Sequence, residues 1–291
     1  MILTAKTILL LLAYLCALPG LAQTVAEEYE EQSENPTLGM SLPVESAPSE
    51  PESYRYRLEV AGFDNHVSNQ FGRWWGGGMS LAANLSERLR LSGQLLSQSR
   101  PGETEQLAGL SALVHWSPSL YSNIALSGGG ADTPEAFFPR VRYDVTVNWK
   151  VPRIPGLILN GGWTRLYFGA PYNGRVLQAG AIYYWRRWVF QQTIFFNNAQ
   201  PGSLPSKSVQ GAVQYGREGG YWLGLTAGGG REAWQSLTLI PQDVEFSSYS
   251  TSIFLRKWLT PTSGIVVSYD YAVKRAAYRI HGLGIKFFVD F

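Results

Sequence analysis

The residues best suited to chemistry stand in the segment FDNHVSNQF, which spans residues 63–71. His66 and Ser68 are two residues apart, and side chains at that spacing share one face of an extended strand. The imidazole of His66 can then take the hydroxyl proton of Ser68, while an acid such as Glu59 orients the ring. The pattern therefore raises the hypothesis of a hydrolase whose catalytic residues are His66 and Ser68.

The four residues from His66 to Asn69 resemble the His-x-Ser-Asn motif of PagL-type lipid A deacylases, which are also outer-membrane barrels. The resemblance implies a lipid A-modifying hydrolase. The sequence departs from that family in two respects, because PagL-type barrels are smaller and carry the motif late in the chain. Here the motif follows the first predicted strand. An ordinary surface loop is the alternative interpretation, and we favour it.

A second group of residues is charged and alternates with apolar residues. A charge that faces lipid at the middle of a bilayer costs about 2–4 kcal/mol, so in a membrane barrel most of these side chains should point inward. Two interpretations stay open: a solvated interior held by charge pairs, or an anion-favouring interior or rim that binds lipopolysaccharide phosphates or an acidic polysaccharide. The expected inward charges are Arg55, Arg57, Glu59, Arg88, Arg90, Arg142, Asp144, Lys150 and Asp270.

No metal or cofactor is expected. The three histidines, His66, His115 and His281, are far apart in the sequence, and Cys16 is the only cysteine. Glycine runs lack the strand–turn–helix context of a phosphate-binding loop, and no nucleic-acid recognition motif is present.

The elements that must position these residues are strands. The segment RVRYDVTVNWK at residues 140–150 alternates apolar and polar side chains, and the same period of two recurs along residues 54–291. Turn residues divide this region into about fourteen strands, with 12 to 16 tolerated. The expected strands are 54–63, 73–85, 88–99, 106–116, 121–129, 139–150, 157–168, 175–185, 188–197, 206–216, 221–229, 246–258, 264–274 and 278–291.

The connections between these strands alternate in length, which favours a transmembrane barrel over a secreted sandwich. Short turns such as RW after Trp185 alternate with longer segments such as DNHVSNQFG, and membrane barrels place their short turns on the periplasmic side. Tryptophans border the short turns, as expected for an aromatic girdle at the lipid–water interface. These are Trp116, Trp149, Trp185, Trp188, Trp222 and Trp258.

The residues before the barrel divide into two segments. Residues 1–22 have Lys6 near the start, an apolar run and a small-residue cleavage site, which predicts a secretory signal peptide. A transmembrane anchor and lipoprotein processing at Cys16 are weaker alternatives. Residues 23–53 contain eight glutamates, four prolines and no Lys or Arg, which predicts a disordered acidic tail in the periplasm. The barrel of residues 54–291 then carries 23 Lys and Arg against 14 Asp and Glu, a net charge of +9.

Residues 54–291 resemble the YaiO family of Gram-negative outer-membrane β-barrels. The resemblance rests on the barrel length, on YGREGGYWLGLTAGGGREAW at residues 215–234, and on LRKWLTPTSGIVVSYDYA at residues 255–272. It implies a fold and an address in the outer membrane, and some relatives look associated with surface polysaccharide or envelope assembly. No catalytic residue carries over from this family.

The final strand ends in LGIKFFVDF, with large apolar residues on one face up to the last residue. Such an ending resembles the signal that the bacterial barrel-assembly machinery reads. The expected assembly signal consists of Leu283, Ile285, Phe287, Val289 and Phe291.

The sequence thus predicts an all-β protein, an antiparallel transmembrane barrel in contact with outer-membrane lipid and lipopolysaccharide. The leading functional hypothesis is a non-enzymatic pore or structural component in transport or envelope polysaccharide export. A lipid A-modifying hydrolase and a structural or adhesive surface barrel are the alternatives.

Overall fold

The computed structural model describes residues 54–130, 136–169, 172–233, 245–274 and 278–291. The expected signal peptide at residues 1–22 and acidic tail at residues 23–53 lie outside these ranges and stay predictions.

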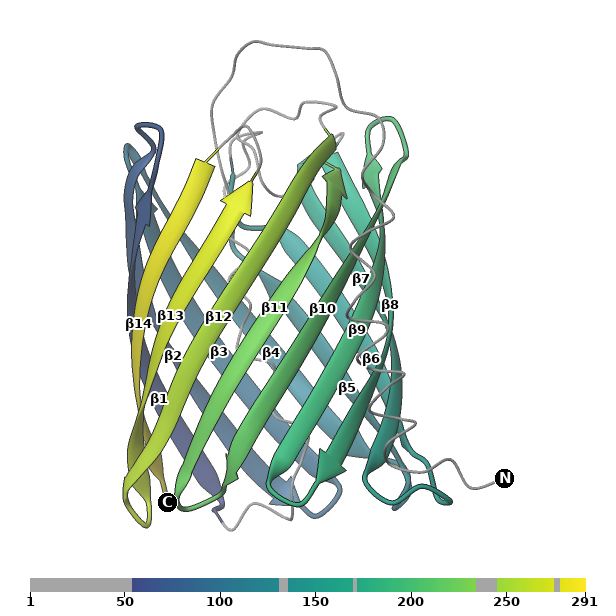
Figure 1. The fold of residues 1–291 in the computed structure, drawn as a ribbon. Coiled ribbons are helices and arrows are strands. Elements are labelled where there is room, and N and C mark those ends of the chain that lie inside the picture. Colours follow the sequence, from purple (N-terminus) through teal and green to yellow (C-terminus); the bar gives the residue numbers. More distant parts are fainter. Residues whose placement is uncertain (1–53, 131–135, 170–171, 234–244, 275–277) are drawn as a thin grey trace. The chain divides into compact units, whose positions relative to one another are not determined.

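The described chain forms one closed sheet in which each strand pairs antiparallel with its neighbours along the sequence (Figure 1). The predicted antiparallel barrel of about fourteen strands is confirmed. No helix in the described ranges is long and apolar enough to cross a membrane. The strands are β1 (Tyr56–Val67), β2 (Gly72–Ser86), β3 (Leu89–Arg100), β4 (Glu103–His115), β5 (Leu120–Gly128), β6 (Val141–Lys150), β7 (Leu157–Gly169), β8 (Tyr172–Trp185), β9 (Trp188–Gln200), β10 (Leu204–Arg217), β11 (Tyr221–Ala233), β12 (Glu245–Thr260), β13 (Ser263–Lys274) and β14 (Tyr278–Asp290).

The alternation of side chains sets the two faces of this wall. On β1, Leu58 and Val60 are exposed on the outside, whereas Arg57 near the start of the strand is buried on the inside. The same alternation gives the barrel an outward apolar band suited to lipid. This band includes Leu58, Val60, Met79, Leu95, Leu110, Ile124, Leu177, Val209, Ile253, Val267 and Ile285.

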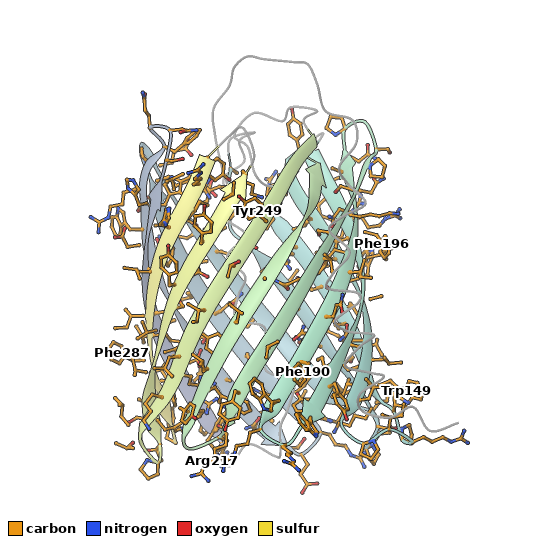
Figure 2. All side chains as sticks on the ribbon, in the orientation of Figure 1. Trp149, Phe190, Phe196, Arg217, Tyr249 and Phe287 are labelled. Atoms are coloured by element: carbon orange, nitrogen blue, oxygen red, sulfur yellow. The ribbon has the colours of Figure 1, made fainter. Side chains whose placement is uncertain are left out.

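Aromatic side chains border the apolar band at both ends, although the predicted tryptophan girdle is only partly correct. Trp149 and Phe190 lie low on the wall in Figure 2, whereas Phe196 and Tyr249 lie higher. The exposed tryptophans beside the short turns are Trp116, Trp149, Trp185 and Trp188. Trp222 and Trp258 differ because each stands at an inward position of its strand, and Trp258 packs edge-on against Phe288 inside the barrel.

The connections define two rims. The short-turn rim carries the connections at 87–88, 116–119, 151–156, 186–187, 218–220 and 261–262, and the loop rim carries the others. The expectation of long segments at the loop rim is wrong in part, because strand pairing continues into residues that resemble a loop. β1 extends to Val67 and β3 to Arg100, so only residues 68–71 and 101–102 remain as connections there. The connections at 129–140 and 234–244 are long, as expected.

The seam between β1 and β14 closes the barrel. The two strands pair in register from Arg57 opposite Asp290 to Val67 opposite Ile280. Beyond that register, Tyr56 and Phe291 exchange two backbone hydrogen bonds of 2.8 and 2.9 Å, and their rings stack with centroids 5.5 Å apart. The final residue is therefore a paired part of the wall.

Two glycines at inward positions allow large rings to lie flat against the wall. Gly264 stands opposite Phe288 and Gly224 stands opposite Phe254. A Cβ at either glycine would overlap the facing ring. Small residues under rings of this kind stabilise a curved sheet.

Deletion of Phe291 should lower the amount of folded barrel in the outer membrane. The deletion removes both terminal hydrogen bonds of the seam and its ring stack. Heat-modifiable gel mobility of outer-membrane fractions measures the folded amount. Leu259→Ala, which shortens an outward side chain 65% exposed on β12, is the control. Equal folded amounts in wild type and the deletion would contradict the role of the seam.

Candidate functional site in the barrel interior

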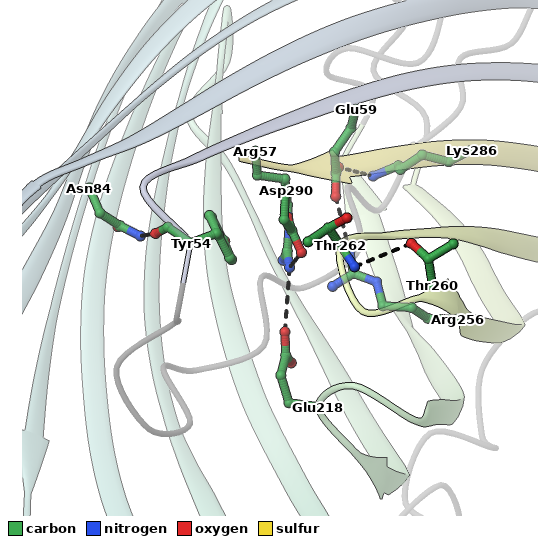
Figure 3. A network of polar contacts seen from close by, with 10 residues as sticks. All are labelled: Tyr54, Arg57, Glu59, Asn84, Glu218, Arg256, Thr260, Thr262, Lys286 and Asp290. Carbon is green, nitrogen blue, oxygen red and sulfur yellow. Dashed lines mark hydrogen bonds and ion pairs between the residues drawn. The ribbon is translucent and has the colours of Figure 1, made fainter.

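The inner face of the barrel gathers the largest set of interacting polar side chains, and its densest part lies near the short-turn rim (Figure 3). Arg57 donates from Nε to Asp290 at 2.6 Å and from Nη2 to the second carboxylate oxygen at 2.9 Å. Both side chains are nearly excluded from solvent. This bidentate pair joins the first and last strands across the seam, so it couples barrel closure to the interior network.

A second ion pair of Arg57 reaches a turn that is distant along the wall. Glu218, in the connection between β10 and β11, lies 3.4 Å from Nη2 of Arg57. Three strands, β12, β13 and β14, separate β11 from β1 in the sheet. The contact therefore crosses the interior, and it holds this turn toward the mouth of the barrel.

Glu59, two residues after Arg57 on β1, is the centre of a second group of ion pairs. Its two carboxylate oxygens accept hydrogen bonds from Arg256 of β12 at 3.1 Å and from Lys286 of β14 at 2.8 Å. All three side chains are at least three-quarters buried. One carboxylate thus balances two cations from different strands.

Aromatic rings enclose these charges. The guanidinium carbon of Arg57 lies 4.0 Å from the centre of the Tyr54 ring and 5.3 Å from that of Phe288. Tyr54 is buried, and its backbone carbonyl accepts a hydrogen bond of 2.8 Å from the side chain of Asn84. Together with Trp258, these rings pack inside the barrel on the side of β12, β14 and β1.

A second group of packed inward side chains, which was not expected from the sequence, lies toward the loop rim. Glu105 accepts hydrogen bonds at one carboxylate oxygen from the backbone N–H groups of Phe137, at 3.2 Å, and Phe138, at 2.9 Å. These bonds hold the buried Phe137 against the wall. The guanidinium of Arg100 lies between rings, 3.8 Å from the centre of Phe137 and 4.4 Å from that of Trp74.

The remaining inner wall is apolar in one part and polar in another. Near the short turns, Tyr121, Ile158, Ile182 and Val189 form a buried apolar cluster. On β6 to β8, Asp144 accepts hydrogen bonds from Arg142 and Thr164, and Gln178 donates to Thr146 at 3.0 Å. On β9 to β12 many inward positions away from the seam carry amides and hydroxyls. These are Gln191, Thr193, Asn197, Ser206, Ser208, Gln210, Gln214, Thr226, Ser248, Ser250 and Ser252.

The remaining predicted charges divide between interior and rim. Arg90 lies 5.8 Å from the Tyr54 ring and Lys150 lies 5.7 Å from the Tyr121 ring, both at inward positions. Asp270 stands at an inward position opposite Ser252. Arg55 and Arg88 are exposed and stand outside the strands: Arg55 precedes β1 and lies over the Tyr56 ring, and Arg88 belongs to the turn after β2.

The residues of the expected assembly signal all lie on the outer face, and each is exposed. Their role in assembly stays a prediction. They are Leu283, Ile285, Phe287, Val289 and Phe291.

The structure does not bring together the residues of the hydrolase hypothesis. His66 is exposed on the outer face of β1, whereas Glu59 lies inside among Arg256 and Lys286. The Ser68 hydroxyl accepts a hydrogen bond of 2.9 Å from the backbone N–H of Arg279. No hydrogen bond joins His66 to Ser68 in the described chain, and no group of three or more metal-ligating side chains occurs there.

Comparisons with known proteins agree with this geometry. The family described as the YaiO membrane beta barrel domain matches residues 56–235. A search of curated proteins returned no significant match.

Solved structures share the fold at low identity. A "Bacterial polysaccharide outer membrane secretin" superposes with a TM-score of 0.56 at 9% identity, covering 81% of this chain and 98% of that one. The "CymD monoaromatic hydrocarbon channel" gives 0.54 at 10% identity, covering 82% and 89%. The toluene transporter TodX of P. putida gives 0.52 at 10% identity, covering 83% and 91%. The fold is that of an outer-membrane β-barrel.

Asp290→Ala should destabilise the barrel by about 3 kcal/mol or more, because it leaves Arg57 buried with a lost bidentate partner. The readout is the folded fraction in a urea titration in detergent micelles. Asp64→Ala removes a partner of Arg73 on the exposed outer face, where both side chains reach solvent, and should cost less than about 1 kcal/mol. Equal losses in the two variants would show that the buried pair is no more important than the exposed one.

Proposed function

The chain belongs to the YaiO family of membrane β-barrels, and from that membership we propose that it is a non-enzymatic channel for a hydrophilic polymer, such as an envelope polysaccharide in export. The observation that carries the proposal is the row of uncharged polar side chains on β9 to β12. Ser250 in that wall is an inward residue that solvent reaches. Amides and hydroxyls offer both donors and acceptors, so they can form hydrogen bonds with the hydroxyl groups of a sugar chain. They do so without a charged group that would bind the chain at one place.

The arrangement of charges supports the same proposal. Arg57, Arg142 and Glu59 each face a partner of opposite sign within 3.1 Å. Paired charges present little net field to a solute, which fits the interpretation of a solvated interior held by charge pairs. A neutral or weakly charged polymer is then a more suitable cargo than a compact anion. One solved barrel of the same fold is described as a polysaccharide secretin, which agrees with this cargo.

A closed structural or adhesive barrel is the second candidate. The buried rings of Tyr54, Trp258 and Phe288 near the short-turn rim favour it, because inward rings at that end leave less room for a solute. The two candidates differ in one measurable property, the passage of ions through the purified barrel in a planar bilayer.

The wild-type barrel should conduct ions in a planar bilayer, and added dextran oligomers should interrupt the current reversibly. Ser250→Trp should reduce the conductance, because it places a large ring on the solvent-accessible inner wall. Thr251→Trp is the matched control, since the next residue of β12 faces outward and its ring would enter lipid. Absence of conductance in the wild type, or equal conductance in both variants, would contradict a channel along this wall.

Shortening inward side chains near the short-turn rim should increase conductance. The double variant Arg256→Ala/Trp258→Ala shortens two inward side chains that lie against Phe288. Tyr249→Ala on the outer face of the same strand is the control. If single-channel recordings of the double variant and the wild type are both silent, the closed structural barrel is the better description.

A further inference from the structure

Basic side chains gather on the outer face of four adjacent strands, between the apolar band and the loop rim. Arg165 of β7 stands directly opposite Arg175 of β8, which stands opposite Asn198 of β9. Lys207 of β10 stands opposite Phe196, the next outward residue of β9. We call Arg165, Arg175, Asn198 and Lys207 the outer basic patch.

Among the described residues, no carboxylate balances the charge of the patch. From residue 141 to residue 217 the sequence contains nine Lys and Arg residues and one acid, Asp144. Asp144 faces the interior and accepts hydrogen bonds from Arg142 and Thr164. No ion pair joins Arg165, Arg175 or Lys207 to an acid in the part of the chain that the structure describes.

One feature of the patch is unfavourable for a wall without a ligand. Arg165 and Arg175 carry like charges and stand directly opposite each other. The Cβ atoms of such a cross-strand pair lie about 5 Å apart, and like charges at that spacing destabilise a sheet. The contrast on the same outer face is Arg73, which donates both of its hydrogen bonds to Asp64. An anion between the two arginines would remove the repulsion in the patch.

The depth of the patch fits the headgroup region of a membrane. The Arg165 guanidinium lies 5.1 Å from the centre of the Tyr167 ring, and the Lys207 ammonium lies 5.8 Å from that of Phe196. Figure 2 shows Phe196 high on the wall, far above Trp149 of the opposite girdle. On the side of the apolar band, the next outward residues include Leu177, Ile194 and Val209, which are exposed to lipid.

We propose that the outer basic patch is a binding site for the phosphate of an outer-leaflet glycolipid, the lipid A part of lipopolysaccharide. Short turns lie on the periplasmic side of membrane barrels, so the loop rim and the patch face the outer leaflet. The planar guanidinium groups match phosphate oxygens bidentately, the Asn198 amide adds a donor, and the apolar band below accepts acyl chains. A soluble acidic polymer fits less well, because it offers nothing to cover the apolar band. The site is independent of any passage through the interior.

The triple variant Arg165→Gln/Arg175→Gln/Lys207→Gln tests the site. The purified full chain in detergent is titrated with bisphosphorylated lipid A and with dephosphorylated lipid A, and native mass spectrometry measures the bound lipid. Wild type should bind the bisphosphorylated form at least about tenfold more tightly than the dephosphorylated form, and the triple variant should lose that preference.

The matched control is Arg153→Gln/Arg187→Gln/Lys257→Gln, which removes the same charge from exposed positions at or near the short-turn rim. It should bind lipid A as wild type does. Heat-modifiable mobility checks that each variant is folded. Equal affinity of wild type for the two lipid forms, equal loss in the control, or undiminished preference in the triple variant would overturn the proposal. If sulfated dextran binds wild type but not the triple variant, the patch would be a site for a soluble polyanion instead.

Discussion

The constraint on which the rest of the structure depends is that no backbone N–H or C=O group in a membrane-spanning wall can be left without a partner. A sheet meets this condition only when its edges meet, and here the edges are β1 and β14. The register of that seam determines which side chains meet inside the barrel. It places Arg57 opposite Asp290, and the bidentate pair that results connects to Glu218. Closure and the interior network therefore depend on the same register.

The strands could be predicted from the sequence because a lipid-facing wall enforces alternation residue by residue. The strand ends were harder to predict. Asp64 to Val67 look like a loop, yet they continue the pairing of β1 beyond the apolar band, where polar side chains carry no desolvation penalty. The faces of Trp222 and Trp258 were predictable in principle. Leu223, Leu225 and Leu255 face outward. Each tryptophan is an odd number of residues from the leucines of its own strand, so it must face inward.

The candidate site was only partly predictable, for a geometric reason. The sequence shows that Arg57 and Glu59 share a face, but the partners Glu218, in a turn, and Arg256, on β12, stand 161 and 197 residues later in the chain. Such contacts depend on how the wall curves, which periodicity does not encode. Glu105 and Arg100 were not expected as interior groups because proline and glycine at 101–102 suggested a loop. The interior that results has a charged and aromatic side at the seam, an apolar cluster around Tyr121 and Ile182, and an uncharged polar wall on β9 to β12.

The position of Tyr54 has a consequence for whatever precedes it. Its ring is held by Arg57 and its carbonyl by Asn84, so Tyr54 is fixed at the inner edge of the mouth. Any upstream segment is thereby tethered at the opening, and its effective local concentration there is high whatever its intrinsic affinity for the barrel. A partner recruited by that segment would be held beside the opening, so even a weak association would suffice to place it there.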